Sequence, residues 1–385
     1  MKINSQVMRI GIAAVFITVL SMACSKNNSP EVPAPEIIIS PAQLVITADR
    51  LSPFIIEPEI RNMSNPSYKW VLNNEVIAIT KDLRYYIQLP GNYKIILTVT
   101  SERISVSREI SITIRARTYE ALISKVFDFL PAPGQLVNEI PSFVSGDTRE
   151  SMIAKANNVL AGQTAGLVSL GGYGGYIVFG FDHLVWNKPG GRDFTISGNA
   201  QDNYAEPGII EVAIDANGNG IPDDEWFEIA GSEYNSPSTI HDYRITYTRP
   251  DPLNDSVYWT DNQGKQGKIF RNIYHIQDSY YPQFYADNEL VFAGTMLSAN
   301  AVKNGSGNTE TWALPAYGWG YADNHANLSN GAALDIDWAV DASGNKVNLQ
   351  GIHFVKVYTG VNENAGWLGE ASTEISGAKD INLDN

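Results

Sequence analysis

The chain has 385 residues, of which 44% are hydrophobic and 18% are charged, so it is long enough for two or three domains with their own cores. Its formal net charge of -15 argues against nucleic-acid binding, because phosphate contacts depend on a concentrated surface of Lys and Arg. The same acidic balance argues against a basic patch that would hold the protein to an anionic membrane surface.

The first 23 residues have the pattern of an export signal. Lys2 and Arg9 accompany an apolar run from Ile10 to Met22, which is shorter than the roughly 20 residues of a membrane-spanning helix. The run leads into LSMAC, in which Cys24 is the only cysteine of the chain, so no intrachain disulfide or Cys-based zinc site can form. LSMAC resembles a bacterial lipobox, which implies that 1–23 is a lipoprotein signal peptide and that Cys24 is lipidated. The alternative is an ordinary secretory signal with a chance cysteine.

Residues 24–36 contain the polar, Pro-spaced stretch SKNNSPEVPAPE, which lacks apolar periodicity and is typical of a tether. A tether of this kind holds a folded body away from a membrane. We therefore expect an outer-membrane lipoprotein at the cell surface, in contact with the membrane only through its lipid anchor.

Residues 37–116 alternate apolar and polar side chains in short runs separated by turn signals, which predicts a β-sandwich. One run places Tyr68 and Trp70 on the same face, and a later run does the same for alternate residues from Tyr93 to Val99. Through this Y-x-W and the later G-x-Y-x-I-x-L-x-V, the region resembles PKD and Ig-like modules. We interpret it as a spacer domain with Trp70 in its core, since Trp is more often buried than a ligand platform.

Residues 117–165 are predicted to be a short helical segment. In TYEALISKVFDFL three apolar residues at intervals of four predict a first helix that stops at Pro131. The apolar stripe consists of Leu122, Val126 and Leu130. A second helix is predicted in TRESMIAKANNVLAG, capped by Asp147 or Thr148 and ended by Gly162.

Residues 166–385 return to strand-like runs such as IVFGF, GIIEVAID, YRITYTR and GIHFVKVYTGV. No internal repeat is visible, so neither a propeller nor a solenoid is indicated. The pattern favours one jelly-roll-like β-sandwich that binds a ligand. The predicted fold class is therefore all-β, with a PKD/Ig-like sandwich, a short helical segment and a larger sandwich in chain order.

The acidic stretch IDANGNGIPDDEW predicts a structural Ca²⁺ site, because it offers oxygen atoms at alternate positions around Gly220. The predicted ligands are Asp215, Asn217, Asn219, the Ile221 carbonyl and Asp223. The twelfth position is Trp226, where an EF-hand has an acid. The alternative is a polar hairpin turn, since Asn-Gly is itself a turn signal.

Motifs for other chemistry are absent from the sequence. GGYGGY lacks the spacing of a dinucleotide fingerprint and leads into a strand, and there is no phosphate-binding GKS or GKT loop, so no redox or nucleotide cofactor is expected. The five histidines include no HExxH pair, and there is no GxSxG nucleophile motif. Paired carboxylates for glycoside hydrolysis remain an alternative, because 42 acids could supply them from distant positions.

Aromatic and amide side chains gather in three stretches of the last third of the chain, VYWTDNQGKQG, YHIQDSYYPQFY and TWALPAYGWGYADNHAN. Aromatic faces beside amides and carboxylates suit a sugar ring or a flat macrocycle with amide arms. The alternative for each residue is a place in the core. The predicted ligand contacts are Trp259, Asp261, Asn262, Tyr280, Tyr281, Trp312, Trp319, Tyr321 and Asn324.

The chain from 117 to 380 resembles a family of Bacteroidetes cell-surface proteins. The resemblance rests on segments that include FLPAPGQ, SLGGYGGYIVFGFDH, EPGIIEV, DANGNGIPDDEWFEIAGSEY, WGYADN and GWLGEASTEISGAKD. It implies a non-enzymatic, lipid-anchored protein of outer-membrane uptake loci, particularly those for cobalamin (vitamin B12), that passes its nutrient to a TonB-dependent transporter. A carbohydrate-binding surface module and a structural adhesin are the alternatives.

Overall fold

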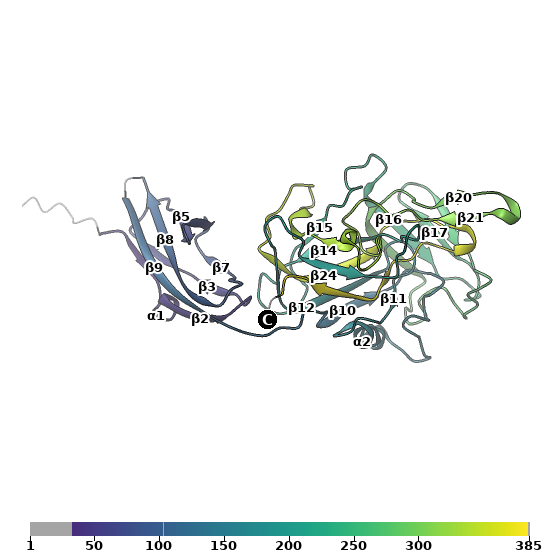
Figure 1. Cartoon of the computed structure of the whole chain (residues 1–385), viewed down its shortest axis with the longest axis horizontal. Coiled ribbons are helices and arrows are strands. Elements are labelled where there is room, and N and C mark those ends of the chain that lie inside the picture. Colours follow the sequence, from purple (N-terminus) through teal and green to yellow (C-terminus); the bar gives the residue numbers. More distant parts are fainter. Residues whose placement is uncertain (1–32, 103, 384–385) are drawn as a thin grey trace, which may run out of the picture.

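The structure is a computed structural model that describes residues 33–102 and 104–383, so the predicted signal peptide and Cys24 lie outside the described residues. Two domains follow one another along an elongated molecule (Figure 1). The smaller domain has its own core of residues between Ile37 and Ile114, and the main core of the larger domain uses residues from Ile123 onward. Strands account for 41% of the residues, which confirms the all-β class.

The smaller domain is built on a five-stranded sheet with the order β2-β9-β8-β5-β6. Its strands are Val45–Asp49 (β2), Ile104–Arg115 (β9), Gly91–Ser101 (β8), Ser67–Leu72 (β5) and Glu75–Ala78 (β6). The other elements are the pair Glu36–Ile38 (β1) and Glu59–Arg61 (β4), the pair Phe54–Ile56 (β3) and Leu83–Tyr85 (β7), and the helix Pro41–Leu44 (α1).

The predicted alternation of this domain is confirmed. Ile95, Leu97 and Val99 of β8 are fully buried on one face, as a period of two residues requires. Trp70 is also fully buried, and its Nε1 donates a hydrogen bond to the carbonyl of Thr80 at 2.9 Å. Trp70 is therefore a core residue with its polar atom satisfied.

The two domains meet through a small cluster of buried side chains, Leu51, Tyr86, Tyr119 and Leu184. The Gln350 side chain bonds both backbone groups of Tyr86, accepting from its N–H at 3.3 Å and donating to its carbonyl at 2.8 Å. These bonds orient the smaller domain against the larger one.

The larger domain is organised around a six-stranded antiparallel sheet with the order β10-β12-β24-β14-β15-β23. The strands are Lys125–Leu130 (β10), Tyr176–Trp186 (β12), Gly351–Thr359 (β24), Gly208–Ala213 (β14), Trp226–Ile229 (β15) and Ala339–Val340 (β23). The central strands are almost continuously apolar and buried, which agrees with cover on both faces.

The first predicted helix of the segment 117–165 is wrong. Its residues instead contribute β10, which pairs with β12 so that Leu130 lies opposite Tyr176 and Lys125 opposite Gly180. An interval of four residues between apolar side chains fits one face of a helix and one face of a strand equally, because four is close to a helical turn and is also an even number. Pairing with β12 decides between the two.

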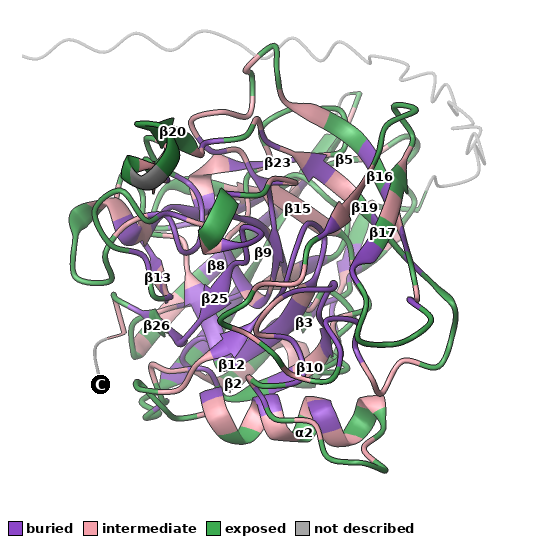
Figure 2. Ribbon diagram, turned by 90° about the vertical axis from the view of Figure 1, so that its right-hand side faces the viewer, coloured by how far each residue is buried: buried purple, intermediate pink, exposed green. Residues whose placement is uncertain are grey.

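The second predicted helix is confirmed as Arg149–Leu160 (α2), capped by the Thr148 side chain. Met152, Ala156 and Leu160 are its buried residues, and they form one stripe along the helix. In Figure 2 this face of α2 is turned toward the sheet and the opposite face is exposed.

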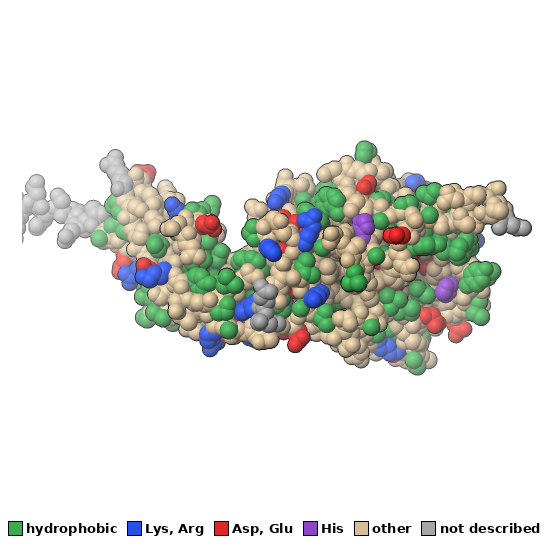
Figure 3. All heavy atoms as spheres, viewed as in Figure 1, with side chains coloured by type: hydrophobic (Ala, Val, Ile, Leu, Met, Phe, Trp, Pro, Cys, Tyr) green, Lys and Arg blue, Asp and Glu red, His purple; other side chains and the backbone are tan. Residues whose placement is uncertain are grey.

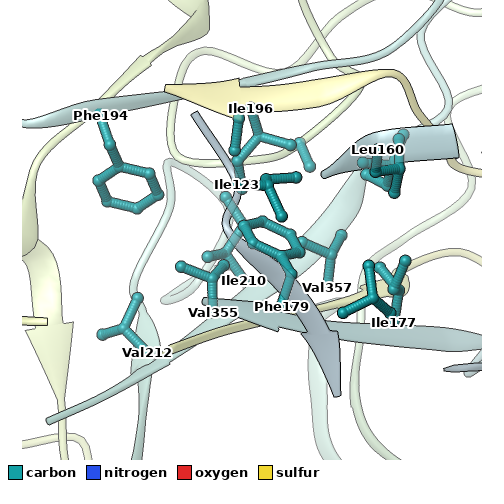
Figure 4. Packing of buried hydrophobic residues seen from close by; sticks show 14 of the residues in the cluster. Ile123, Leu160, Ile177, Phe179, Phe194, Ile196, Ile210, Val212, Val355 and Val357 are labelled. Atoms are coloured by element: carbon teal, nitrogen blue, oxygen red, sulfur yellow. The ribbon is translucent and has the colours of Figure 1, made fainter. Parts of the chain in front are cut away.

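The main core lies between the central sheet, α2 and a three-stranded sheet. That sheet consists of Ala333–Leu334 (β22), Phe194–Ser197 (β13) and Gly377–Asp380 (β26). Figure 4 shows Phe179 of β12 close to Ile123 and to side chains of β14 and β24. Strands that are distant in sequence therefore share one core.

A second core, rich in tyrosine, lies beneath a four-stranded sheet with the order β18-β17-β16-β19. Its strands are Gln266–Ile269 (β18), Val257–Asp261 (β17), Ile240–Thr248 (β16) and Glu289–Met296 (β19). The remaining short elements are Val168–Ser169 (β11), Glu374–Ile375 (β25), Val302–Asn304 (β20) and Thr311–Ala313 (β21), and the 3-10 turns Gly307–Thr309, Asn330–Ala332, Ile336–Trp338 and Gly366–Leu368.

Acidic and basic side chains are interspersed on the face shown in Figure 3. Within the described residues, no helix has the length and apolar character needed to cross a membrane.

Candidate functional site

A cavity of about 390 Å³ opens between loops of the larger domain. Its walls come from segments that are far apart in sequence, including the loop after β10, the loop between β13 and β14, and the loop after β24. The lining residues are Gln135, Leu136, Asn199, Tyr204, Glu206, Asn272, Tyr274, His275, Leu314, Ala365, Trp367, Leu368, Glu370, Ser372 and Glu374.

Three aromatic side chains of the cavity lining are exposed to solvent. Tyr204 is 48% exposed, Tyr274 is 70% exposed and Trp367 is 51% exposed. The face of an accessible aromatic ring can pack against the apolar face of a ligand. These three residues, which we call the aromatic rim, can offer ring faces to a ligand.

Hydrogen bonds tie the loops of the cavity together. The Asn272 Nδ2 donates to Gln135 Oε1 at 3.1 Å and to the Trp367 carbonyl at 2.9 Å. The Gln135 Nε2 in turn donates to the carbonyl of Leu368 at 2.8 Å. The loop that carries Trp367 is therefore held in place before any ligand arrives.

Three carboxylic acids converge beside the cavity, and we call Glu206, Asp323 and Glu374 the acid cluster. One carboxylate oxygen from each lies within 4.8 Å of the others. Glu206 and Glu374 line the cavity, while Asp323 and Glu374 are buried. None of the three forms an ion pair with a described Lys, Arg or His side chain.

Backbone amides hold the acid cluster in position. Asp323 Oδ1 accepts from the N–H groups of Asn199 and Ala200, both at 2.8 Å, and its Oδ2 accepts from Glu374 N at 3.0 Å. Glu206 Oε1 accepts from Ser372 N at 2.9 Å. Asp323 adopts a left-handed backbone conformation with φ of 49°, which Asp tolerates better than most residues.

Glu374 is held by side chains as well. Its Oε1 accepts from Ser372 Oγ at 2.8 Å, and its Oε2 accepts from Asn199 Nδ2 at 3.1 Å.

Burial raises the pKa of all three acids of the cluster, and repulsion between neighbouring carboxylates raises the pKa of Glu206 and Glu374 further. A fourth acid, Glu370, lines the same cavity and is 2% exposed, and burial raises its pKa to about 7. Its Oε1 accepts from Gln135 N at 2.5 Å, whereas its buried Oε2 has no hydrogen-bond partner.

Sequence reasoning missed these four acids, although a signal was present. Glu206 lies in EPGIIEV, Asp323 in WGYADN, and Glu370 and Glu374 in GWLGEASTEISGAKD, all of them segments that carry the family resemblance. The acids stand too far apart in sequence for spacing to relate them, and only the fold brings them together.

Four of the predicted ligand contacts are buried and lie outside the cavity lining, and a ligand role for them stays a prediction. Tyr280 and Tyr281 are fully buried in the tyrosine-rich core. Tyr280 supports the site indirectly, because its hydroxyl donates to the carbonyl of His275, a lining residue, at 2.9 Å. Tyr321 and Asn324 are also buried. The Asn324 side chain accepts from the N–H of Tyr317 and donates to its carbonyl.

The other five predicted contacts lie outside the cavity lining, and a binding role for them stays a prediction. Asp261 and Asn262 organise the hairpin between β17 and β18 and its neighbour β16 through backbone hydrogen bonds. Trp259 packs over Gly267 of the same hairpin. The last two are Trp312, which packs against Gly366, and Trp319, whose ring is tilted by 46° against that of Trp338 with the centroids 4.4 Å apart.

The predicted calcium loop, residues 215–226, is a compact turn that we call the Asp215 loop. Asp215 accepts from three backbone N–H groups, those of Gly218, Asn219 and Gly220, at 2.6, 3.1 and 3.0 Å. The amides of Asn217 and Asn219 both donate to Asp223. The carboxylates of Asp215 and Asp223 therefore accept hydrogen bonds from within the loop. Calcium binding here stays a prediction.

No protein-family model matches the chain, and no curated protein matches it. Among solved structures, a PKD domain of a human protein is 18% identical over 24% of this chain and 94% of its own, with a TM-score of 0.19. A SusE-like protein is 8% identical over 90% of this chain and 96% of its own, with a TM-score of 0.26. A structure of carbohydrate-binding modules from the β-sandwich superfamily is 11% identical over 92% of this chain and 100% of its own, with a TM-score of 0.19. Likenesses of this size assign no ligand.

Proposed function

We propose that the protein is a lipid-anchored cell-surface protein that captures a small polyhydroxylated nutrient, such as a saccharide, in the cavity. The observation that carries this proposal is the aromatic rim above a lining of carboxylate and amide groups. The apolar face of a sugar ring packs on an aromatic ring, and its hydroxyls bond to carboxylates and amides. A cavity of about 390 Å³ falls in the size range of small-molecule sites.

Cobalamin, the nutrient that the family resemblance implies, is the second ligand in this proposal. A corrinoid with its nucleotide arm is much larger than a single sugar, so it would enter the cavity only in part, with the aromatic rim against one face of the macrocycle. The present geometry therefore favours the smaller ligand.

Transfer to a TonB-dependent transporter remains part of the proposal. Exposed apolar side chains next to the aromatic rim support a protein contact there, because large exposed apolar groups mark interaction sites. Ile273 is 80% exposed and Ile276 is 82% exposed.

Binding is tested by calorimetric titration of the purified exported chain with a panel of oligosaccharides and with cobalamin. Trp367→Ala should weaken binding of the true ligand about 10-fold or more, because the ring face of a stacked aromatic is lost. Tyr258→Ala is the control, since Tyr258 is 56% exposed but lies outside the cavity lining. An equal loss of affinity in both variants, or in neither, would contradict the cavity as the binding site.

A glycoside hydrolase is a second candidate function, because carboxylic acids with raised pKa values converge on the cavity. Such an enzyme needs one protonated acid and one ionised acid across the scissile bond. Sensitive product analysis after long incubation with the bound oligosaccharide separates the two functions. Intact ligand supports a binding protein, whereas cleavage that Glu206→Gln abolishes would establish the hydrolase.

A further inference from the structure

We propose that the acid cluster is a divalent-cation site, and that Ca²⁺ bound by Glu206, Asp323 and Glu374 forms part of the wall of the cavity. This site is distinct from the Asp215 loop, and it stands whether or not the ligand of the cavity is a saccharide.

The first argument is the spacing of the oxygen atoms. Ca²⁺ holds its oxygen ligands at 2.3–2.6 Å, so two ligands of the same ion lie at most roughly 5 Å apart. Oxygen atoms from Glu206, Asp323 and Glu374 all lie within 4.8 Å of one another. The donors are all carboxylates, which suit a hard cation, and neither cysteine nor histidine takes part.

The second argument is charge. No described cationic side chain forms an ion pair with the acid cluster, and buried carboxylates are costly unless a positive charge compensates them. A divalent cation would supply that charge where the protein offers none.

The third argument is the unsatisfied carboxylate oxygen of Glu370. This side chain is 2% exposed and its Oε2 lacks a partner, yet it lines the same cavity as Glu206 and Glu374. The second oxygen of Glu206 likewise has no hydrogen bond with any described residue, since only its Oε1 is bonded. Uncommitted acceptors at this wall fit an ion or its coordinated water.

The remaining coordination positions of the ion would face the cavity. Asp323 is fixed by backbone N–H groups and Glu374 by the side chains of Ser372 and Asn199, whereas Glu206 is only partly buried and borders the cavity. Ca²⁺ takes six to eight oxygen ligands, so water or ligand hydroxyls would complete its shell from that side.

The test is to strip the purified exported chain with a chelator, add Ca²⁺, and measure bound metal by elemental analysis and stability by thermal unfolding. We expect a tightly bound Ca²⁺ and a rise in Tm on the order of 5 °C when Ca²⁺ is about 100-fold above its Kd. Glu206→Gln should abolish this ion and this rise, whereas Asp223→Asn in the Asp215 loop should leave both. Glu225→Gln, at an exposed acid, is the matched control for loss of charge.

Three outcomes would overturn the assignment. Loss of the ion in Asp223→Asn but not in Glu206→Gln would place calcium in the Asp215 loop alone. An unchanged Tm and no bound metal in the wild type would mean that the cluster is neutralised by protons. A response to Mg²⁺ and not to Ca²⁺ would exclude calcium. If Glu206→Gln does not give the native circular dichroism spectrum, Glu374→Gln serves as the second variant, with the same expected loss.

Discussion

The Asp215 loop and the acid cluster are both acidic, but their carboxylates are satisfied in different ways. The Asp215 loop is contiguous in sequence and largely exposed, and its oxygen atoms accept from amides of the loop itself. The acid cluster is assembled from segments far apart in sequence and is mostly buried. A contiguous acidic motif can therefore supply its own hydrogen-bond donors. Acids that the fold brings together need donors or positive charge from other segments to compensate their burial.

The difference matters because solvent screens charges in the Asp215 loop but not in the acid cluster. Asp223 is exposed, and hydrogen bonds from Asn217 and Asn219 lower its pKa. In the acid cluster burial acts in the opposite direction and raises the pKa values. In the acid cluster a bound cation would offset this cost of burial, whereas the exposed Asp223 carries no such cost.

The largest effect is expected for Asp323→Ala, compared with Asp215→Ala. Each aspartate accepts from three backbone N–H groups, but at Asp323 those of Ala200 and Glu374 are left buried and unpaired when the carboxylate is removed. Relief of repulsion between carboxylates offsets only part of this loss. We expect Asp323→Ala to lower the free energy of unfolding by about 4 kcal/mol and Asp215→Ala by about 1 kcal/mol, measured by urea denaturation. Equal losses would mean that burial does not distinguish the two regions.

A somewhat smaller effect is expected for Gly198→Ala, compared with Gly220→Ala. A Cβ at Gly198 would stand 2.1 Å from Asp323 Oδ1 and 2.6 Å from the Glu374 carbonyl oxygen, so the cluster must shift. Gly220 has φ of +71° but no atom within 4 Å of its Cβ position, so alanine there meets only backbone strain. We expect losses of about 3 kcal/mol and about 1 kcal/mol respectively in urea denaturation. A tolerated Gly198→Ala would show that the cluster is loosely packed.

Glu228 separates the effect of burial from that of clustering, because it is a partly buried acid outside both regions. Burial raises its pKa to about 7 from the ordinary 4.5, although Thr295 Oγ1 donates to it at 2.6 Å. The folded protein therefore holds this proton more tightly than the unfolded chain does. Its contribution to stability is fully present below pH 4.5 and is lost as the pH rises through about 7.

Glu228→Gln should consequently lose less stability between pH 4.5 and 8 than the wild type, by on the order of 2 kcal/mol. The measurement is urea denaturation at several pH values, with the exposed Glu225→Gln as the control. Parallel pH profiles for Glu228→Gln and the wild type would show that Glu228 titrates normally.

The smallest effect is expected at Arg84, which connects the smaller domain to the Asp215 loop. Its Nη2 donates to the carbonyl of Asp215 at 3.1 Å. Because this is one partly exposed hydrogen bond, Arg84→Ala should cost less than about 1 kcal/mol. Thermal unfolding compared with that of Arg108→Ala, an exposed arginine of the same domain, measures the difference. A loss of several degrees in Tm would mean that the loop is a principal domain contact.

Local features were predictable from the sequence because they depend on near neighbours. The alternation in β8, the buried Trp70, the presence and cap of α2, and the all-β class follow from periodicity, composition and turn or cap residues. The first predicted helix was wrong because its four-residue apolar interval fits both a helix and a strand. Pairing with β12, which lies much later in the sequence, selected the strand.

The cavity and its acids could not be predicted in this way. Tyr280 and Tyr281 have the composition expected of a binding loop, yet packing buries them and leaves Tyr274 of the same stretch on the aromatic rim. Glu206 and Glu374 carry no local pattern that relates them. Outside β10, the sequence by itself determined which segments become strands and which faces are apolar, since these depend on residues a few positions apart. Only the tertiary structure decided which acids meet and which aromatic rings stay exposed, because both depend on how distant strands and loops pack together.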